Sequence, residues 1–430
     1  MTRRFKWTVV GTSTCLVVLL LVGSLNGRAV SSDDVYGHLK VYSEVLQRIK
    51  LEYVEEPDMK SVTVGAINGL LESVDPFASY LNPDQYKQYE TMSDKKQADV
   101  GLVLAKRFGY VAIVDAIPGS PAAKANLATG DLIDSIKGVA TRDMPLAYAE
   151  QLLRGEPNST IEITVLRVKN PEPVKITLTR APVQYPPVTA KLMPGQVGYV
   201  QVETLAGDAV AHVKAKVEDL KKQGAKYMVL DLRHCTTGKQ ESGIALANLF
   251  MDKGEITALK GQRVARQQFD AKPGAEVWSG PLVITTNRST AGGAEIAAAA
   301  LLGNKRAQVV GERTYGDAGV RRIVQMDDGA AVILSVAKFY APSGKAIQDT
   351  GVVPTVQVAD MDTSPDYDDN GNPIPGTEPK NVQDNILKNA VELVTGKTTV
   401  AQLNDNPAPP IETGDSEAPI LRKNDVPPQN

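Results

Sequence analysis

The sequence predicts an α/β core preceded by a helical segment and a small strand-rich domain. Strands alternate with helices over residues 191–360, an order typical of a largely parallel sheet covered by helices. Apolar residues recur at helical spacing over residues 33–96. Short apolar strands separated by glycine-bearing turns follow over residues 97–168. A chain of 430 residues has the length for roughly two to four such domains.

Composition and charge exclude several classes of protein. Hydrophobic residues make up 42% and charged residues 23% of the chain, as in ordinary globular proteins. A net charge of −3 gives no reason to expect a nucleic-acid partner. Because His38, His212 and His234 are far apart in the sequence, we expect no metal site and no cofactor. The two cysteines, Cys15 and Cys235, predict no disulfide, since Cys15 lies in an apolar run near the N-terminus.

The first 32 residues are expected to direct export. Arg3, Arg4 and Lys6 precede a mostly apolar stretch, residues 9–22, in the order found in secretory signals and signal-anchors. This stretch is short for a membrane span, which needs about 20 apolar residues, and no A-x-A cleavage site follows it. A cleaved signal, an uncleaved anchor and a buried helix therefore remain as alternatives. The expected location is periplasmic or otherwise extracytoplasmic.

Residues 33–96 are expected to form a helical N-terminal domain. Apolar residues at helical spacing from Leu39 to Tyr53 indicate a first helix, and a second covers about residues 59–73. Asp75-Pro76 and Asn82-Pro83 are turn signals that follow it. We interpret these helices as packing elements, with an interaction domain as the alternative.

Residues 97–168 are expected to form a small domain of short strands joined by tight turns. The segment Pro118–Ala123 enters a short helix, and Gly130-Asp131 forms a tight turn before the apolar strand 132–136. The spacing fits the PDZ pattern P-x-S-P-A-x-x-A-G-[LI]-x-x-G-D-x-I, except that Asn126 replaces a glycine. Asparagine tolerates the positive φ that such a turn requires.

The PDZ resemblance implies a site for peptides or protein C-termini. A PDZ domain binds an extended peptide as an added strand and captures its carboxylate with backbone N–H groups of one loop. In this chain the resemblance places that loop at Val100, Gly101 and Leu102. The alternative is a PDZ domain that only packs or regulates.

The α/β core is expected to follow a proline-punctuated connection, residues 169–190, in which proline allows edge strands or a linker. Beyond the core, residues 361–380 are interpreted as an acidic linker, residues 382–394 as a short amphipathic helix, and the chain from Lys397 as disordered. The core strands and helices expected up to residue 311 are, in chain order, 197–202, 208–223, 227–232, 241–250, 282–286, 294–302 and 307–311.

The stretch Asn287–Gly319 is where we expect the chemistry. A strand enters a polar turn and a small-residue helix leaves it, so backbone N–H groups and turn side chains point at one spot, as where a nucleophile is presented. The stretch resembles the active-site region of the carboxy-terminal processing peptidases, or tail-specific proteases, which use a Ser–Lys dyad. Their pattern is N-x-x-[ST]-A-S-A-x-E, a helix, and G-E-x-T-[FY]-G-K-G. The residues that fit it without a gap are Asn287, Ala291, Glu295, Gly311, Glu312, Thr314, Tyr315 and Gly316.

The departures from this family pattern fall on the catalytic positions. The resemblance places the family's serine at Gly292, its lysine at Asp317 and a glutamine that follows at Arg321. In the family's D-L-R-x-N-x-G-G loop, near the oxyanion site, this chain has Thr237 for one glycine and keeps Gly238. No intact catalytic residue is therefore expected.

Further matches at residues 53–56, 75–81 and 338–354 extend the resemblance over about residues 35–358. It implies an α/β core of protease/crotonase-like ββα units with an inserted PDZ domain and a helical N-terminal domain. The expected boundaries are 1–32 for the signal or anchor, 33–96 for the helical domain, 97–168 for the PDZ domain, 169–360 for the core and 361–430 for linker, helix and tail.

Two functions are compatible with these residues. The first is an exported pseudo-protease that binds peptides, with an active paralogous protease or a second copy of the chain as further partners. The second is an active serine endopeptidase with a displaced dyad, drawn from Ser289 or Thr290 with Lys305 or Lys345. A His234–Cys235 pair is not expected, because adjacent residues on an extended strand point to opposite faces. Asp317 has three candidate ion-pair partners, namely Arg313, Arg321 and Arg322.

Overall fold

The computed structural model describes residues 32–93, 98–107, 109–142, 144–167, 170–361, 374, 376–377 and 383–405. The expected export segment, most of the acidic linker and the tail beyond residue 405 lie outside these ranges. Within them, no helix has both the length and the apolar character needed to cross a bilayer. The chain divides into two units, Met1–Ala66 and Ile67–Asn430, which are described separately.

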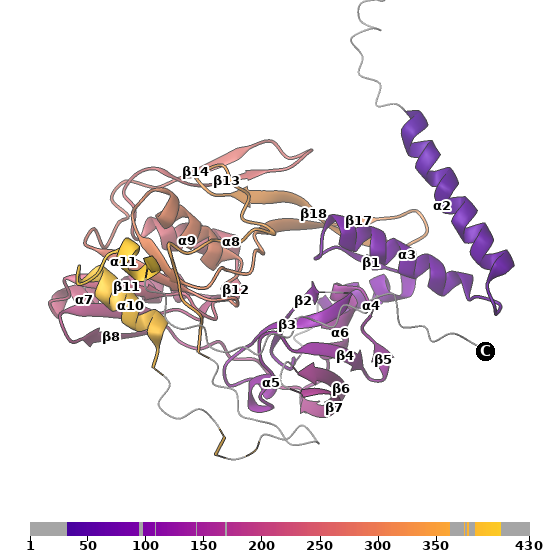
Figure 1. Ribbon diagram of the computed structural model, residues 1–430, viewed down its shortest axis with the longest axis horizontal. Helices are drawn as coiled ribbons and strands as arrows, with labels where there is room; N and C mark the ends of the chain where they lie inside the picture. The colour runs from indigo at the N-terminus through magenta and orange to yellow at the C-terminus, as the bar shows by residue number, and fades with distance from the viewer. Residues whose placement is uncertain are drawn as a thin grey trace, which may run out of the picture. The chain divides into compact units, whose positions relative to one another are not determined.

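In the first unit, α2 (Ser32–Glu52) is a helix of 21 residues, and α3 (Met59–Val74) begins seven positions after it ends and continues into the second unit. Both helices were predicted from the apolar spacing (Figure 1). Asp58 begins α3, because its carboxylate accepts hydrogen bonds from the Lys60 backbone N–H and the Ser61 hydroxyl. Several apolar side chains of α2, including Leu39 and Val45, are exposed.

In the second unit, α3 is followed by a short strand that the sequence did not predict. β1 (Ser79–Leu81) pairs antiparallel with β18 (Ala331–Tyr340), and α4 (Pro83–Ser93) follows it. Asn82 caps α4: its side-chain oxygen accepts from Gln85 N at 3.0 Å, and Gln85 Oε1 accepts from Asn82 N at 3.1 Å. Proline in the first turn suits this start, because its missing N–H would have no helical partner.

The PDZ region is an antiparallel sheet in the order β2-β3-β4-β6-β7, with β5 on β4. Its elements are β2 (Leu102–Arg107), β3 (Tyr110–Ala116), α5 (Pro121–Lys124), β4 (Leu132–Ile136), β5 (Val139–Ala140), α6 (Leu146–Leu153), β6 (Thr160–Arg167) and β7 (Asn170–Thr179) (Figure 1). The sheet runs past residue 168, because β7 pairs with β6 as an edge strand in the proline-punctuated segment. Asn126 adopts a φ of 54°, the turn conformation expected of it.

The core sheet has the order β19-β16-β15-β11-β9-β8. All neighbouring pairs are parallel except β8 with β9, so the predicted largely parallel sheet is confirmed. Its strands are β8 (Thr189–Met193), β9 (Val197–Gln201), β11 (Tyr227–Asp231), β15 (Leu282–Thr286), β16 (Gln308–Gly311) and β19 (Val356–Gln357).

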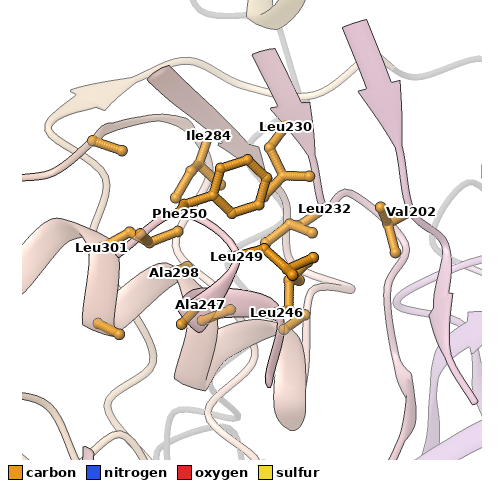
Figure 2. Packing of buried hydrophobic residues seen from close by; sticks show 14 of the residues in the cluster. Val202, Leu230, Leu232, Leu246, Ala247, Leu249, Phe250, Ile284, Ala298 and Leu301 are labelled. Carbon is orange, nitrogen blue, oxygen red and sulfur yellow. The ribbon is translucent and has the colours of Figure 1, made fainter. Parts of the chain in front are cut away.

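Helices cover both faces of this sheet. Leu230 and Ile284 pack with α7 (Ala209–Lys222), α8 (Gln240–Asn248) and α9 (Gly293–Gly303). Figure 2 shows Phe250 beside Leu230 and Ile284 in this cluster. The alternate residues Val229 and Val283 face the opposite side and pack with α10 (Asn385–Val394). The near-continuous apolar strands in the sequence follow from this burial on two faces.

A second, antiparallel sheet joins segments that are distant in the sequence. It has the order β1-β18-β13-β14, with β17 also on β18. Its further strands are β13 (Glu255–Lys260), β14 (Gln267–Asp270) and β17 (Gly319–Gln325). A separate two-stranded parallel sheet joins β10 (Thr204–Leu205) to β12 (Thr237–Gly238).

The C-terminal region corrects one expectation. α10 was predicted, and Asp384 caps it by accepting from Leu387 N at 2.9 Å. α11 (Val400–Asp405) is a second helix in the segment that composition predicted to be disordered, so that prediction is wrong for these residues. Val400 and Leu403 pack beside the cluster formed by α10, which supplies the burial that their local sequence did not indicate.

Candidate functional site

The turn between β15 and α9 is held by Asn287. Its side-chain oxygen accepts hydrogen bonds from His234 N at 3.1 Å and Ser289 N at 3.2 Å. Its backbone N–H donates to Thr290 Oγ1 at 3.0 Å. Asn287 is almost completely buried, so these bonds fix the entry into the helix that Gly292 begins.

Gly292 lies at the sharp point of this turn. Its φ is 63° and its ψ is −123°, a conformation that glycine adopts freely and other residues adopt only under strain. A Cβ added at this position would have its nearest contact at 3.7 Å, with the backbone oxygen of Asp317. The backbone therefore makes a sharp strand-to-helix turn of the kind that presents a nucleophile, and a Cβ at this position would meet no close contact.

Glu295 joins the Gly292 turn to the second glycine-rich turn. One carboxylate oxygen accepts from Gly292 N at 3.0 Å and from Asp317 N at 2.8 Å. The other accepts from Gly316 N at 2.7 Å and from the hydroxyl of Thr314. Glu295 is completely buried, and this burial raises its pKa to about 7 although the hydrogen bonds lower it. The two positions of interest are thus held next to each other by a third residue.

Asp317 is ion-paired with Arg321. Of the three candidate arginines this is the partner, while Arg313 donates to the backbone oxygen of Asp349. Burial raises the pKa of the Asp317 carboxyl, and the charge of Arg321 opposes that rise. The Arg321 guanidinium also lies 4.3 Å from the ring centroid of Phe77.

The residues considered for a displaced dyad are committed to other contacts or distant. The Ser289 hydroxyl donates to the backbone oxygen of Val114 at 2.8 Å and lies 2.8 Å from the Thr129 hydroxyl. The Thr290 hydroxyl donates to the backbone oxygen of Leu232 at 2.9 Å. Both serine and threonine are buried.

The candidate lysines lie on the exposed surface of the protein. Lys305 is exposed and follows the opposite end of α9, roughly 16 Å along the helix axis from Gly292. Lys345 is also exposed. A Ser–Lys dyad needs a lysine beside the hydroxyl in an enclosed site, whereas both of these lysines are exposed.

The loop expected near the oxyanion site is built on a close backbone approach. Gly238 has a φ of 120°, and a Cβ there would lie 2.5 Å from the backbone carbonyl carbon of Leu205. Thr237 pairs with Thr204 in the β10–β12 sheet, and their hydroxyls lie 2.8 Å apart. The close approach to Leu205 thus requires a glycine at position 238. Thr237 is held in place by its pairing with Thr204.

His234 and Cys235 do not form a catalytic pair. Cys235 is completely buried in the core cluster, and burial raises the pKa of its thiol. His234 is partly exposed, with Nδ1 3.2 Å from an oxygen of Asp115 and Nε2 3.0 Å from the amide nitrogen of Asn287. The expectation is confirmed for a different reason: His234 has a φ of 59°, so the chain has left the extended strand at this point.

The PDZ loop is already bonded within the chain. The backbone N–H groups of Val100 and Gly101 donate to Asp99 Oδ1 at 2.6 and 3.1 Å. Leu102 begins β2, the edge strand of the sheet. Sequence reasoning did not single out Asp99; an acidic residue directly before the loop was the signal that could have identified it.

Comparison with known proteins places the chain in a family. Residues 196–358 match the model of peptidase family S41, and residues 113–167 match that of the PDZ domain. The chain is 32% identical over 314 residues to the carboxyl-terminal-processing protease of Synechocystis sp.. The matched region covers 71% of this chain and 73% of that protein. The chain belongs to the carboxyl-terminal-processing protease family.

Two further proteases match this chain over a similar share of its length. A carboxy-terminal-processing protease of Bartonella bacilliformis is 27% identical over 363 residues, 83% of each chain. The solved structure of a photosystem II D1 C-terminal processing protease superposes with a TM-score of 0.60 at 29% identity, covering 73% of this chain and 86% of that one. The predicted fold, an α/β protease core with a PDZ-like antiparallel sheet and N-terminal helices, is confirmed.

Proposed function

We propose that this member of the carboxyl-terminal-processing protease family is a pseudo-protease that binds peptides without hydrolysing them. One observation carries the proposal. The turn that would present the nucleophile has a sharp backbone and space for a Cβ, yet the residue there is Gly292. The position opposite it is Asp317, whose carboxylate is paired with Arg321.

Neither half of a Ser–Lys dyad has a chemical equivalent at these positions. Such a dyad needs a hydroxyl within hydrogen-bond reach of an amine that is neutral enough to accept its proton. Gly292 supplies no side chain. A carboxylate is a much weaker base than a lysine amine, and that of Asp317 is bound to a guanidinium.

Binding is assigned to the PDZ domain, since this class of domain suggests recognition of peptide C-termini. Among the strands that the structure describes, β2 pairs with β3 alone, so its other edge is assigned as the place for an added strand. The basic and apolar N-terminal sequence supports a location outside the cytoplasm for this binding.

The competing function is an active serine endopeptidase with a displaced dyad. The hydroxyls of Ser289 and Thr290 are the nearest substitutes, but both are buried and donate to backbone oxygens. A nucleophile must be able to leave its ground-state hydrogen bonds and reach a substrate carbonyl. These contacts therefore favour the non-catalytic assignment.

Incubation with denatured casein, together with labelling by a serine-reactive fluorophosphonate, tests the proposal. The purified full-length chain should neither cleave nor become labelled, while an active family member assayed in parallel should do both. Turnover that disappears in Ser289→Ala or in Thr290→Ala would instead establish the displaced dyad. Turnover that persists in both variants would be assigned to a contaminant.

A further inference from the structure

The carboxylate-binding loop of the PDZ domain contains its own carboxylate. In a PDZ domain the loop N–H groups converge on one point and bind an anionic ligand end. Here two of those groups, from Val100 and Gly101, converge on one oxygen of Asp99. The other oxygen of Asp99 lies 3.4 Å from Arg154 Nε, at the end of α6.

This loop is fixed in its present form by the backbone around it. Asp99 exchanges both of its backbone hydrogen bonds with Ala181, at 3.0 Å each. The carbonyl of Val100 accepts from Ala122 N at 2.9 Å, and that of Gly101 accepts from Ile117 N at 2.9 Å. A Cβ on Gly101 would lie 2.2 Å from Cβ of Ser120, so the loop and α5 are in close contact. The N–H groups are thus aimed at Asp99 by a rigid frame.

A ligand with a free terminal carboxylate would meet two costs at this loop. It would have to displace Asp99 from two hydrogen bonds to a charged acceptor, which are stronger than those between neutral groups. It would also approach a second negative charge, which Arg154 only partly offsets because both side chains are partly exposed. A chain that continues past the loop meets neither cost, since it brings no charge there.

We infer that Asp99 takes the place of a ligand carboxylate, so that the PDZ domain selects extended internal segments of a polypeptide over free C-termini. This inference rests on the proposed peptide-binding function and narrows its ligand class. Pairing with the β2 edge uses only backbone groups of the ligand, so it is available to an internal segment. Asp99 is thereby a specificity-determining residue.

Binding of three fluorescent peptides to the full-length protein tests this assignment. The peptides share one apolar sequence and end in a free carboxylate, in an amide, or in an extension of several further residues. The wild type should bind the amidated and extended peptides more tightly than the free-carboxylate peptide. In Asp99→Ala the two N–H groups are released, so the free-carboxylate peptide should gain about tenfold in affinity while the amidated peptide should not.

Two further variants control this experiment. Asp99→Asn keeps an acceptor oxygen for the loop but removes its charge, so its preference should lie between those of wild type and Asp99→Ala. Glu162→Ala, on the exposed face of β6, removes an acidic residue of the same domain that does not contact the loop and should change nothing. Thermal unfolding of each variant shows whether the domain remains folded.

The outcomes separate this inference from the proposed function. A wild type that prefers the free-carboxylate peptide at least tenfold, with no change in Asp99→Ala, would overturn the role of Asp99 and leave peptide binding standing. No binding of any peptide to wild type or to Asp99→Ala would overturn both. If Asp99→Ala is unfolded, a free-carboxylate preference of Asp99→Asn equal to that of the wild type overturns the inference.

Discussion

Glu295 accepts a hydrogen bond from the backbone N–H of Asp317 at 2.8 Å, and the same oxygen accepts from Gly292 at 3.0 Å. Buried Glu295 therefore holds together the two turns that would carry a nucleophile and a base, although Glu295 itself would be neither. Glu295 thus fixes both turns through backbone N–H groups, without using a side chain at position 292 or 317.

Restoring the dyad should need more than two substitutions. Gly292→Ser with Asp317→Lys supplies the hydroxyl and the amine, but the Arg321 guanidinium loses its carboxylate partner and still occupies the space beside the new side chain. We expect weak casein cleavage from this double variant and none from either single variant, since nucleophile and base act as a unit. Adding Arg321→Gln, the residue implied by the family resemblance, should raise the rate about tenfold, a change of about 1.4 kcal/mol in the barrier.

The matched control for this restoration is Arg322→Gln, an exposed neighbour, added to the same double variant. It should leave the rate unchanged. Cleavage by a single variant would show that the site has been misplaced. Full activity of the double variant would show that neither Arg321 nor Thr237 impairs the surroundings.

Glu295→Gln should destabilise the protein by about 1–3 kcal/mol, because it sets an amide donor against backbone donors that need an acceptor. Urea unfolding at pH 8, above the pKa of about 7, measures this change with the carboxyl ionised. Glu241→Gln, exposed in the first turn of α8, is the control and should cost much less. Equal losses of stability from the two substitutions would mean that Glu295 does not hold the two turns together.

Gly238→Ala should be more harmful than Gly224→Ala, although both glycines have positive φ. At Gly224 an added Cβ has no neighbour within 4 Å, so the cost is backbone strain alone, about 1 kcal/mol. At Gly238 the same atom would overlap the backbone of Leu205, so β10 and β12 must separate. Free energies of unfolding of the two variants check this, and equal losses would refute the close approach.

The stability contribution of His234 should depend on pH. Burial lowers the pKa of His234, but the hydrogen bond and charge of Asp115, assisted by Asp360, outweigh burial and raise it. A histidine with a raised pKa in the folded state stabilises fully below its unfolded pKa of about 6.5 and loses that contribution as pH rises through the folded value. Nearby Arg233 opposes this rise, and the carboxyl of Glu203 also faces the ring.

Comparing the wild type with His234→Gln over pH 5.5–8.5 isolates this effect. The stability difference between the two proteins should shrink as pH rises. A difference for His234→Gln that grows with pH would mean that burial controls its pKa.

The sequence by itself determined the elements whose signals are local. β4 and β15 match their predicted ranges, because an apolar strand bounded by turn residues reports its own limits. The positive φ of Asn126 followed from its place in a turn pattern. The order of strands and helices gave the parallel sheet, since parallel strands require long connections.

Only the tertiary structure decided which distant groups meet. Ser79 pairs with Ile333 across β1 and β18, and the Ser289 hydroxyl bonds to Val114, yet no local periodicity specifies partners so far apart in the chain. The acceptor of the Val100 N–H was likewise undetermined, since an acidic residue in a loop has many rotamers and many donors within reach. In the structure the Val100 N–H donates to Asp99. This bond depends on the loop backbone, which is held by hydrogen bonds to Ala181, Ile117 and Ala122 that form only in the folded chain.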